Sequence, residues 1–262
     1  MTDERLRALT VRYRVRFDEC GPTGTLRAAA YLRYAQDVAW IHSERLGYDR
    51  DWYTARGIGW LVRGVELELI EPVGTGQELD LTTLVIGFRR VWARRRTDVR
   101  TVDGRLVARA LTDWVLADRQ GQPTRVPAEF PERFGLAAAP FSPIRVTLPP
   151  QPPDAVEIRL AVRYQELDPM GHANNAAYLE WIDELVRAWA EHGAPGHGAP
   201  NHRASDPTVR FPRSYRLEYL APVGPASALV ATAWADGDGV ACRLSDEAGA
   251  ESFRARLGPG VG

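Results

Sequence analysis

Residues 15–37, VRFDECGPTGTLRAAAYLRYAQD, align without a gap with residues 162–184, VRYQELDPMGHANNAAYLEWIDE, at an offset of 147. Nine of the 23 aligned positions are identical, including the proline and glycine of the turn and the Ala-Ala-Tyr-Leu run after it. A second match follows in the same order, LELIEPVG (67–74) with LEYLAPVG (217–224), at an offset of 150. This period is far too long for a solenoid, so the sequence predicts two copies of one domain.

A change in composition marks the boundary between the copies. Residues 121–155 are dense in proline, which fixes φ and lacks a backbone donor, so we expect a mostly extended and irregular linker. We therefore expect an N-terminal domain over residues 1–120 and a C-terminal domain over residues 156–262.

Each copy shows the same order of expected elements: a short strand, a turn, one long helix and several strands. Apolar residues at helical spacing predict helices over residues 25–46 and 174–191. Alternating, β-forming stretches predict strands near residues 11–17, 58–70, 78–88, 91–101, 105–117, 208–220, 227–235, 239–245 and 251–257. A helix that is apolar over much of its circumference must be covered by a sheet, so the expected fold class is α+β.

The pattern D-P-x-G-H-x-N-N-x-x-Y at residues 168–178 resembles that of hot-dog thioesterases. Two such copies in one chain resemble the acyl-acyl-carrier-protein (acyl-ACP) thioesterase family, and LRYAQDVAWIHSERLG (32–47) is similar to that family's helix segment. The resemblance implies a tandem (double) hot-dog, two curled antiparallel sheets each wrapping a long central helix. It also implies hydrolysis of acyl thioesters, with acyl-ACP as the first expected substrate and acyl-CoA as the alternative.

Comparison of the copies separates scaffold from chemistry. The polar residues of the motif are Asp168, His172, Asn174 and Asn175. Their counterparts in the first copy are Gly21, Thr25, Arg27 and Ala28. Because the first copy is expected to build the same turn without the polar set, this difference favours a catalytic role for the set in the second copy.

The polar set suits thioester hydrolysis. Asp168 can act as base or nucleophile, and the N–H of Asn175 or its neighbour at the helix start can polarise the carbonyl. His172 can bind water or pass a proton, and Asn174 or Asn175 can orient the substrate. The structural alternatives are a turn-forming aspartate and helix-capping asparagines.

Other residues are assigned to binding. We expect Gly171, Tyr178 and Trp60 to contact the substrate, with the first copy supplying the acyl pocket. The arginines of RRR (94–96) could dock an acidic carrier protein, although charge that protects an edge strand is an equal alternative.

Two positions depart from the plant-type members of the family. Met170 stands where they have asparagine, and Pro222 and Val223 stand where they have a Glu-Cys pair. A cysteine nucleophile is therefore not expected. A hot-dog dehydratase and a non-catalytic acyl-binding protein stay open as alternatives.

Composition excludes several classes. A net charge of -1 over 262 residues gives no global field for nucleic acid, and no apolar run is long enough to span a membrane. The two cysteines show no metal or disulfide spacing, and the histidines at 192, 197 and 202 lie in a Gly/Pro-rich loop. We expect a cytoplasmic protein, monomer or homodimer, without a metal, nucleotide or redox cofactor.

Overall fold

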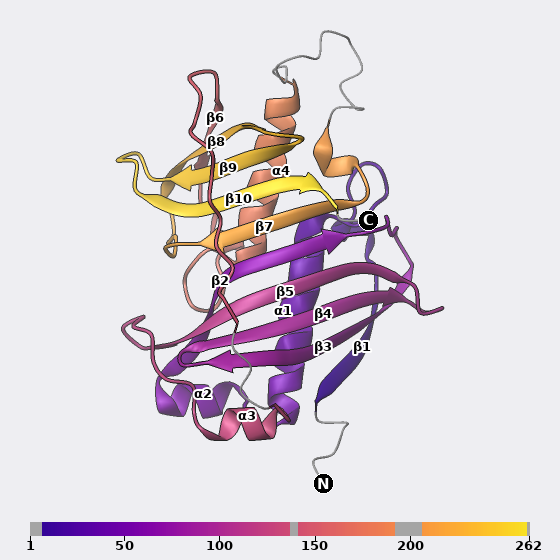
Figure 1. Ribbon diagram of the computed structural model, residues 1–262, viewed down its shortest axis with the longest axis vertical. Helices are drawn as coiled ribbons and strands as arrows, with labels where there is room; N and C mark the ends of the chain where they lie inside the picture. Colours follow the sequence, from indigo (N-terminus) through magenta and orange to yellow (C-terminus); the bar gives the residue numbers. More distant parts are fainter. Residues whose placement is uncertain (1–6, 137–140, 192–205, 261–262) are drawn as a thin grey trace. The chain divides into compact units, whose positions relative to one another are not determined.

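The computed structural model describes residues 7–136, 141–191 and 206–260 (Figure 1). The chain divides into two compact units. Unit 1 comprises Met1–Leu67 and Glu71–Ile144, and unit 2 comprises Glu68–Ile70 and Arg145–Gly262. One boundary between the units lies inside the expected linker, between residues 144 and 145.

Unit 1 combines a five-stranded sheet with one long helix. Its elements are β1 (Ala8–Arg14), α1 (Ala28–Arg45), α2 (Arg50–Arg56), β2 (Ile58–Leu69), β3 (Glu78–Arg89), β4 (Trp92–Thr101), β5 (Leu106–Asp118) and α3 (Glu129–Arg133). The strand order is β1-β3-β4-β5-β2, with antiparallel pairing from β1 through β5. Buried and less buried residues alternate along β3, as expected for a strand with one face on a core.

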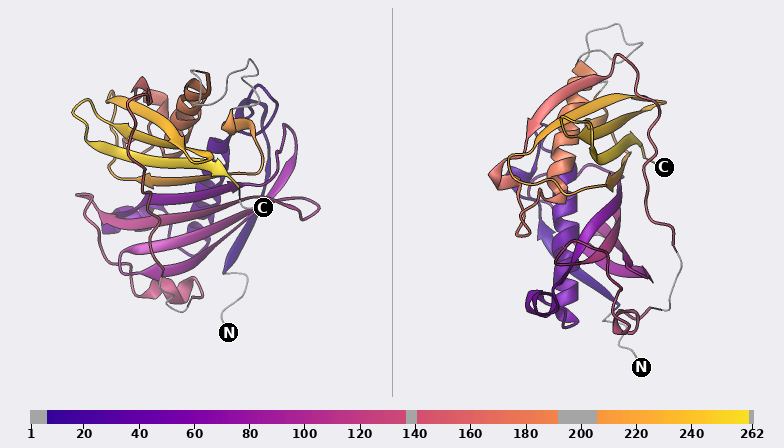
Figure 2. Two further views of the ribbon diagram at one scale, coloured as in Figure 1. Left: turned by 45° about the horizontal axis from the view of Figure 1, so that its top comes forward. Right: turned by 90° about the vertical axis from the view of Figure 1, so that its left-hand side faces the viewer.

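Helix α1 packs against β1 and β3 of its own unit (Figure 2). It begins at Ala28, three residues later than the sequence predicts, because residues 25 and 26 form isolated β-bridges with Gly74 and Cys20. Gly47 follows the helix with φ +89°, a left-handed conformation that favours glycine.

Unit 2 likewise contains five strands and one long helix. Its elements are β6 (Val156–Ala161), α4 (Asn175–Glu191), β7 (Arg213–Tyr219), β8 (Ala228–Asp236), β9 (Gly239–Ser245) and β10 (Glu251–Pro259), with the short 3-10 helices η3 (Tyr164–Glu166) and η4 (Pro207–Val209). The strand order is β7-β10-β9-β8-β6, and α4 packs against β6, β8 and β9. The α+β class is confirmed in both units.

The structure corrects several sequence-based boundaries. Strand β7 begins at residue 213 rather than 208, after Pro212, which cannot donate to a strand neighbour. Helix α2 was not predicted; its signals are Asp49, whose side chain accepts the N–H of Trp52, and Gly57, with φ +62° at the C-cap.

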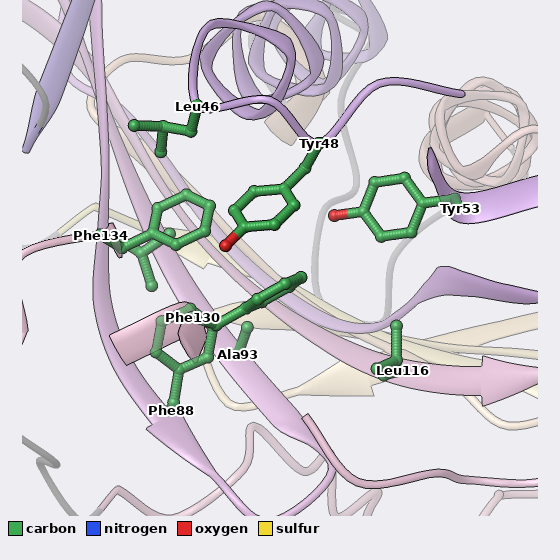
Figure 3. Packing of buried hydrophobic residues seen from close by; sticks show 9 residues of the cluster. Leu46, Tyr48, Tyr53, Phe88, Ala93, Leu116, Phe130 and Phe134 are labelled. Atoms are coloured by element: carbon green, nitrogen blue, oxygen red, sulfur yellow. The ribbon is translucent and has the colours of Figure 1, made fainter. Parts of the chain in front are cut away.

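The expected linker is less irregular than its prolines suggest. Helix α3 lies within it, and Phe130 and Phe134 of this segment are buried. These two rings join a cluster of buried residues in unit 1 (Figure 3). The cluster consists of Leu46, Tyr48, Tyr53, Val85, Phe88, Ala93, Leu116, Phe130 and Phe134. The first part of the linker therefore belongs to the core of unit 1.

Candidate active site

A tight turn in unit 2 holds the polar motif. The N–H of Asp168 donates to the carbonyl of His172 (2.8 Å), and the N–H of Gly171 donates to the carbonyl of Asp168 (2.9 Å). An isolated bridge joins Leu167 to Ala173, after which α4 begins. Gly171 has φ +80°, so its role in this structure is to close the turn. A contact of Gly171 with substrate stays a prediction.

Unit 1 contains a turn with the same backbone hydrogen bonds. The N–H of Gly21 donates to the carbonyl of Thr25 (2.8 Å), and the N–H of Gly24 donates to the carbonyl of Gly21 (2.9 Å). Gly24 has φ +78°, and a bridge joins Cys20 to Leu26. The backbone of the turn therefore forms without an aspartate or histidine, as the comparison of the copies implied.

The Asp168 carboxylate is half-buried in the turn. Its Oδ1 accepts the N–H of Met170 at 2.8 Å, which leaves Oδ2 outside this bond. The Asp168 carboxylate interacts electrostatically with the phenol of Tyr178. Burial and, to a smaller extent, the negative charge of Asp168 raise the pKa of Tyr178 to about 12, although a hydrogen bond with the Val223 backbone lowers it. Tyr178 is therefore a neutral phenol at physiological pH.

The His172 ring is half-buried. Among the described residues, it takes part in no hydrogen bond or ion pair, whereas its carbonyl is held by Asp168. The ring is thus positioned by its backbone and keeps both nitrogens available to a substrate or water.

The two asparagines have different roles. Asn174 caps α4, because its Oδ1 accepts the N–H of Ala176 (2.9 Å) and its carbonyl accepts the N–H of Ala177 (2.8 Å). Asn175 is the first helical residue, and its carbonyl accepts the hydroxyl of Tyr219 (3.0 Å). The capping alternative therefore holds for Asn174.

The start of α4 leaves one backbone donor without an acceptor. Of the first three helical N–H groups, those of Ala176 and Ala177 are bonded to Asn174. In the described part of the chain, no acceptor is found for the N–H of Asn175. Such a donor at the positive end of a helix dipole is suited to stabilise an oxyanion.

Glu166 supports this helix start, and sequence reasoning did not assign it a role. Its carboxylate accepts the N–H of Arg163 (2.7 Å) and the indole N–H of Trp181 (3.1 Å), and its carbonyl accepts the N–H of Asn174 (2.8 Å). Glu19 makes the matching bonds in unit 1, to Arg16 and Tyr34. The available signal was the identity of these two glutamates in the aligned copies.

The loop after β7 contacts the motif. The N–H of Ala173 donates to the carbonyl of Val223 at 2.8 Å, as Leu26 does to Val73 in unit 1. The chain position at which the plant-type family has its Glu-Cys pair therefore adjoins the turn, but here its side chains are apolar. Cys242 is buried on β9, and burial raises the pKa of its thiol far above its ordinary value. That thiol is not an activated nucleophile.

Trp60 lies in unit 1. Its indole N–H donates to the hydroxyl of Tyr53 (3.0 Å), and its ring packs on the buried aromatic cluster. Trp60 is thus part of a core, and its contact with substrate stays a prediction.

The arginines at 94–96 do not form one exposed basic cluster, which corrects the expectation from the sequence. Strand alternation separates Arg95 from its neighbours. Arg94 is bonded through Nε and Nη2 to the buried carboxylate of Asp113 (2.7 and 2.8 Å), and Arg95 is only 7% exposed. Docking of a carrier stays a prediction for Arg96 alone, whose side chain is 40% exposed.

Within the described ranges, no group of three or more His, Cys, Asp and Glu side chains could hold a metal ion. The histidines at 192, 197 and 202 lie outside the described residues. No helix of the described residues is long and apolar enough to cross a membrane.

Comparison with known families gives two matches along the chain. Residues 7–134 match the acyl-ACP thioesterase N-terminal domain, and residues 151–192 match the C-terminal domain of the same family. The chain belongs to the acyl-ACP thioesterase family. The second match contains the whole polar motif, and the first contains Trp60 and the arginines at 94–96. Comparison with curated protein sequences gives no match.

Several solved structures of thioesterases share the fold. A candidate oleoyl thioesterase from Lactobacillus plantarum is 15% identical with a TM-score of 0.79, covering 98% of this chain and 97% of its own. An acyl-ACP thioesterase from Bacteroides thetaiotaomicron is 15% identical, with a TM-score of 0.77 and coverage of 97% and 98%. The 12:0-ACP thioesterase from Umbellularia californica is 20% identical, with a TM-score of 0.76 and 96% coverage of both chains. At these identities, the likeness is one of fold.

Proposed function

We propose that this chain hydrolyses acyl-ACP to a free fatty acid and ACP at the turn of unit 2, with Asp168 as the central catalytic residue. One observation carries the site assignment. The turn backbone is duplicated in unit 1 without an aspartate or a histidine, and only unit 2 adds to it a carboxylate and an imidazole. Family membership supports the reaction, and it makes the chain a thioester hydrolase.

Each group has a separate task in the proposed mechanism. The thioester carbonyl oxygen accepts the N–H of Asn175, which stabilises negative charge as the carbonyl carbon becomes tetrahedral. Asp168 takes a proton from a water whose oxygen attacks that carbon. His172 gives a proton to the departing sulfur, so that the products are a carboxylic acid and a thiol. The Asn175 side chain orients the acyl group.

A nucleophilic Asp168 is the second form of the mechanism. Its carboxylate would attack the carbonyl carbon, break the C–S bond and form an anhydride, while His172 protonates the departing thiolate; water then cleaves the anhydride. In single-turnover hydrolysis in ¹⁸O-labelled water, label in the Asp168 carboxylate identifies the nucleophilic form, because water can attack the aspartyl carbon only in the anhydride.

We also propose that the two units form a tandem hot-dog. The support is that each unit has five strands in one sheet and one long helix packed on that sheet. A cytoplasmic location and a monomeric or homodimeric state stay predictions, and sedimentation would measure the latter.

The reaction is tested by thiol release from acyl-ACP and acyl-CoA of equal chain length, monitored with a thiol reagent. We expect higher kcat/KM with acyl-ACP. Faster turnover of acyl-CoA would identify the chain as an acyl-CoA thioesterase. Binding without thiol release would instead support the acyl-binding alternative, and hydration or dehydration of the acyl group would support the dehydratase alternative.

A further inference from the structure

A buried arginine lies between the sheet and the long helix of unit 1. The Nη1 atom of Arg95 lies 2.8 Å from Nδ1 of His42 on α1 and 3.4 Å from Oγ1 of Thr83 on β3. Because a guanidinium only donates, His42 accepts through Nδ1 and its ring is neutral, with the proton on Nε2. Both partners of Arg95 are therefore neutral. In the described part of the chain, no carboxylate pairs with this buried charge.

One edge of the Arg95 guanidinium has no protein partner. Its Nε and Nη2 atoms take part in no hydrogen bond with any described residue. Two other arginines of this chain use their Nε and Nη2 atoms to bind a carboxylate. Arg12 donates to Asp80 (2.8 and 2.9 Å), and Arg94 donates to Asp113 (2.7 and 2.8 Å). Two parallel N–H groups match the two oxygens of a carboxylate. Arg95, only 7% exposed, thus presents a fork of the shape that this chain uses for carboxylates.

Aromatic rings lie close to the fork. The Phe134 ring centre lies 5.8 Å from the Arg95 guanidinium carbon and 5.5 Å from the His42 ring centre. Phe134 belongs to the buried cluster, in which the rings of Phe130 and Phe134 have centres 5.8 Å apart (Figure 3). Burial lowers the pKa of Arg95 to about 10, which reflects the cost of removing this charge from water. An anion at the fork would offset that cost.

Unit 2 shows that the fold does not need this polar network. The β3–β4 and β8–β9 hairpins both have two-residue turns, so their paired residues can be matched outward from the turn. The two long helices are matched by the sequence offset of 147. The polar network of unit 1 is His42, Thr83, Arg95 and Thr97. The corresponding residues of unit 2 are Trp189, Ala231, Cys242 and Leu244. Apolar residues therefore serve the same positions of the helix–sheet layer.

We propose that Arg95, supported by His42, binds a carboxylate that is carried on an aliphatic or aromatic body inside unit 1. Two sources supply this chemistry. One is a free carboxylic acid, such as the fatty acid that hydrolysis releases. The other is a carboxylate at the far end of an acyl thioester. Only this second source rests on the proposed function.

Direct binding to the full chain tests the site without turnover. Dodecanoate and dodecanol have the same chain but differ in charge, and Trp60, packed on the cluster, reports binding by its fluorescence. We expect wild-type protein to bind dodecanoate at least about tenfold more tightly than dodecanol. Arg95→Met should lose this preference, with an unchanged affinity for dodecanol. Arg96→Met, one residue along β4, is the matched control and should keep the preference.

A second variant, Arg95→Lys, keeps the test possible if Arg95→Met does not fold, because lysine keeps the positive charge but lacks the two parallel N–H groups. We expect it to retain part of the preference. Equal binding of acid and alcohol by wild-type protein would overturn the proposal. So would a full preference for the acid in folded Arg95→Met.

Turnover distinguishes the two sources. The substrates are an acyl-ACP with a terminal carboxylate and a methyl-ended acyl-ACP of equal length. A fall in kcat/KM of Arg95→Met for the carboxylate-ended substrate alone places the site at the end of the acyl chain. Unchanged kcat/KM with lost dodecanoate binding places a free acid there. If wild-type protein hydrolyses neither substrate, the proposed function fails and the binding result still stands.

Discussion

Asp168 serves both the turn and the proposed chemistry. One carboxylate oxygen accepts the N–H of Met170, as a turn aspartate commonly does, so residue type and spacing alone could not separate the structural interpretation from the catalytic one. The separation comes from Gly21, which closes the same turn in unit 1 with no side chain at all.

The substitution Asp168→Asn isolates the charge. The amide oxygen can still accept the N–H of Met170, so we expect the free energy of unfolding to change by about 0.5 kcal/mol or less. Loss of the base or nucleophile should lower kcat/KM with acyl-ACP by roughly 10²–10⁴-fold. Thiol release and denaturant unfolding measure the two effects. Near-normal turnover would show that Asp168 is only a turn residue.

The matched control is Gly21→Asp in unit 1. The nearest atom to a Cβ at this position is the Thr25 carbonyl oxygen at 3.9 Å, so the side chain fits. It restores the acid without the imidazole, and we expect neither a second site nor a gain in rate.

At the scale of single elements, the sequence predicts helix existence better than helix starts. The first helix begins at residue 28 rather than 25, because the preceding residues pair as β-bridges with segments distant in sequence. No local pattern reports such a pairing. The second helix begins at Asn175, and this one-residue difference from the prediction decides which asparagine is the cap.

Substitution of each asparagine by alanine separates cap from site. Asn174→Ala removes the acceptor of the Ala176 N–H and should lower the free energy of unfolding by about 1 kcal/mol, with Asn174→Asp retaining most of it. Asn175→Ala keeps the backbone donor and should lower kcat/KM with little change in stability. Chemical denaturation and kinetics on the same preparations measure both. The reverse pattern would exchange the roles assigned to the two residues.

The two glutamates that brace the helix starts provide a matched pair. Glu19→Ala and Glu166→Ala each remove the acceptor of a backbone N–H and of an aromatic side-chain donor. We expect similar losses in stability, on the order of 1–3 kcal/mol each. Only Glu166→Ala should also lower kcat, because it alone braces the helix that carries Asn175. Equal losses of kcat in the two variants would contradict this local role.

At the scale of the whole molecule, duplication made much of the fold predictable. The repeated motif located both long helices, and one boundary between the two units lies within the proline-rich stretch. The burial of individual side chains could not be deduced from the repeat. The run at 94–96 looks uniformly basic, yet the strand separates a charge paired with Asp113, a buried charge and a half-exposed one. The burial and ion pairing of each arginine depend on its partners in neighbouring strands, and these partners cannot be deduced from the local sequence.

The stability of the molecule should also carry a pH dependence from a carboxyl group in unit 2. Asp183 on α4 accepts the hydroxyl of Tyr215 at 2.9 Å, and burial raises its pKa to about 7. The positive charge of Arg213 and the Tyr215 hydrogen bond lower this pKa, whereas the negative charges of Asp206 and Glu180 raise it. In the unfolded chain, the same group ionises near its ordinary value of about 4.

Between these two pKa values the unfolded chain binds fewer protons than the folded chain. This contribution to the free energy of unfolding is therefore fully present below about pH 4 and declines until the pH passes about 7. Asp183→Asn cannot ionise and still accepts the Tyr215 hydroxyl, so its stability relative to wild type should rise over that range and then level off. Because Asp183 keeps some contact with solvent, we expect a change on the order of 1 kcal/mol. Denaturant unfolding at several pH values measures it, with the exposed neighbour variant Glu184→Gln as control. Parallel stability profiles for wild type and Asp183→Asn would show that Asp183 is ionised throughout this range in the folded protein.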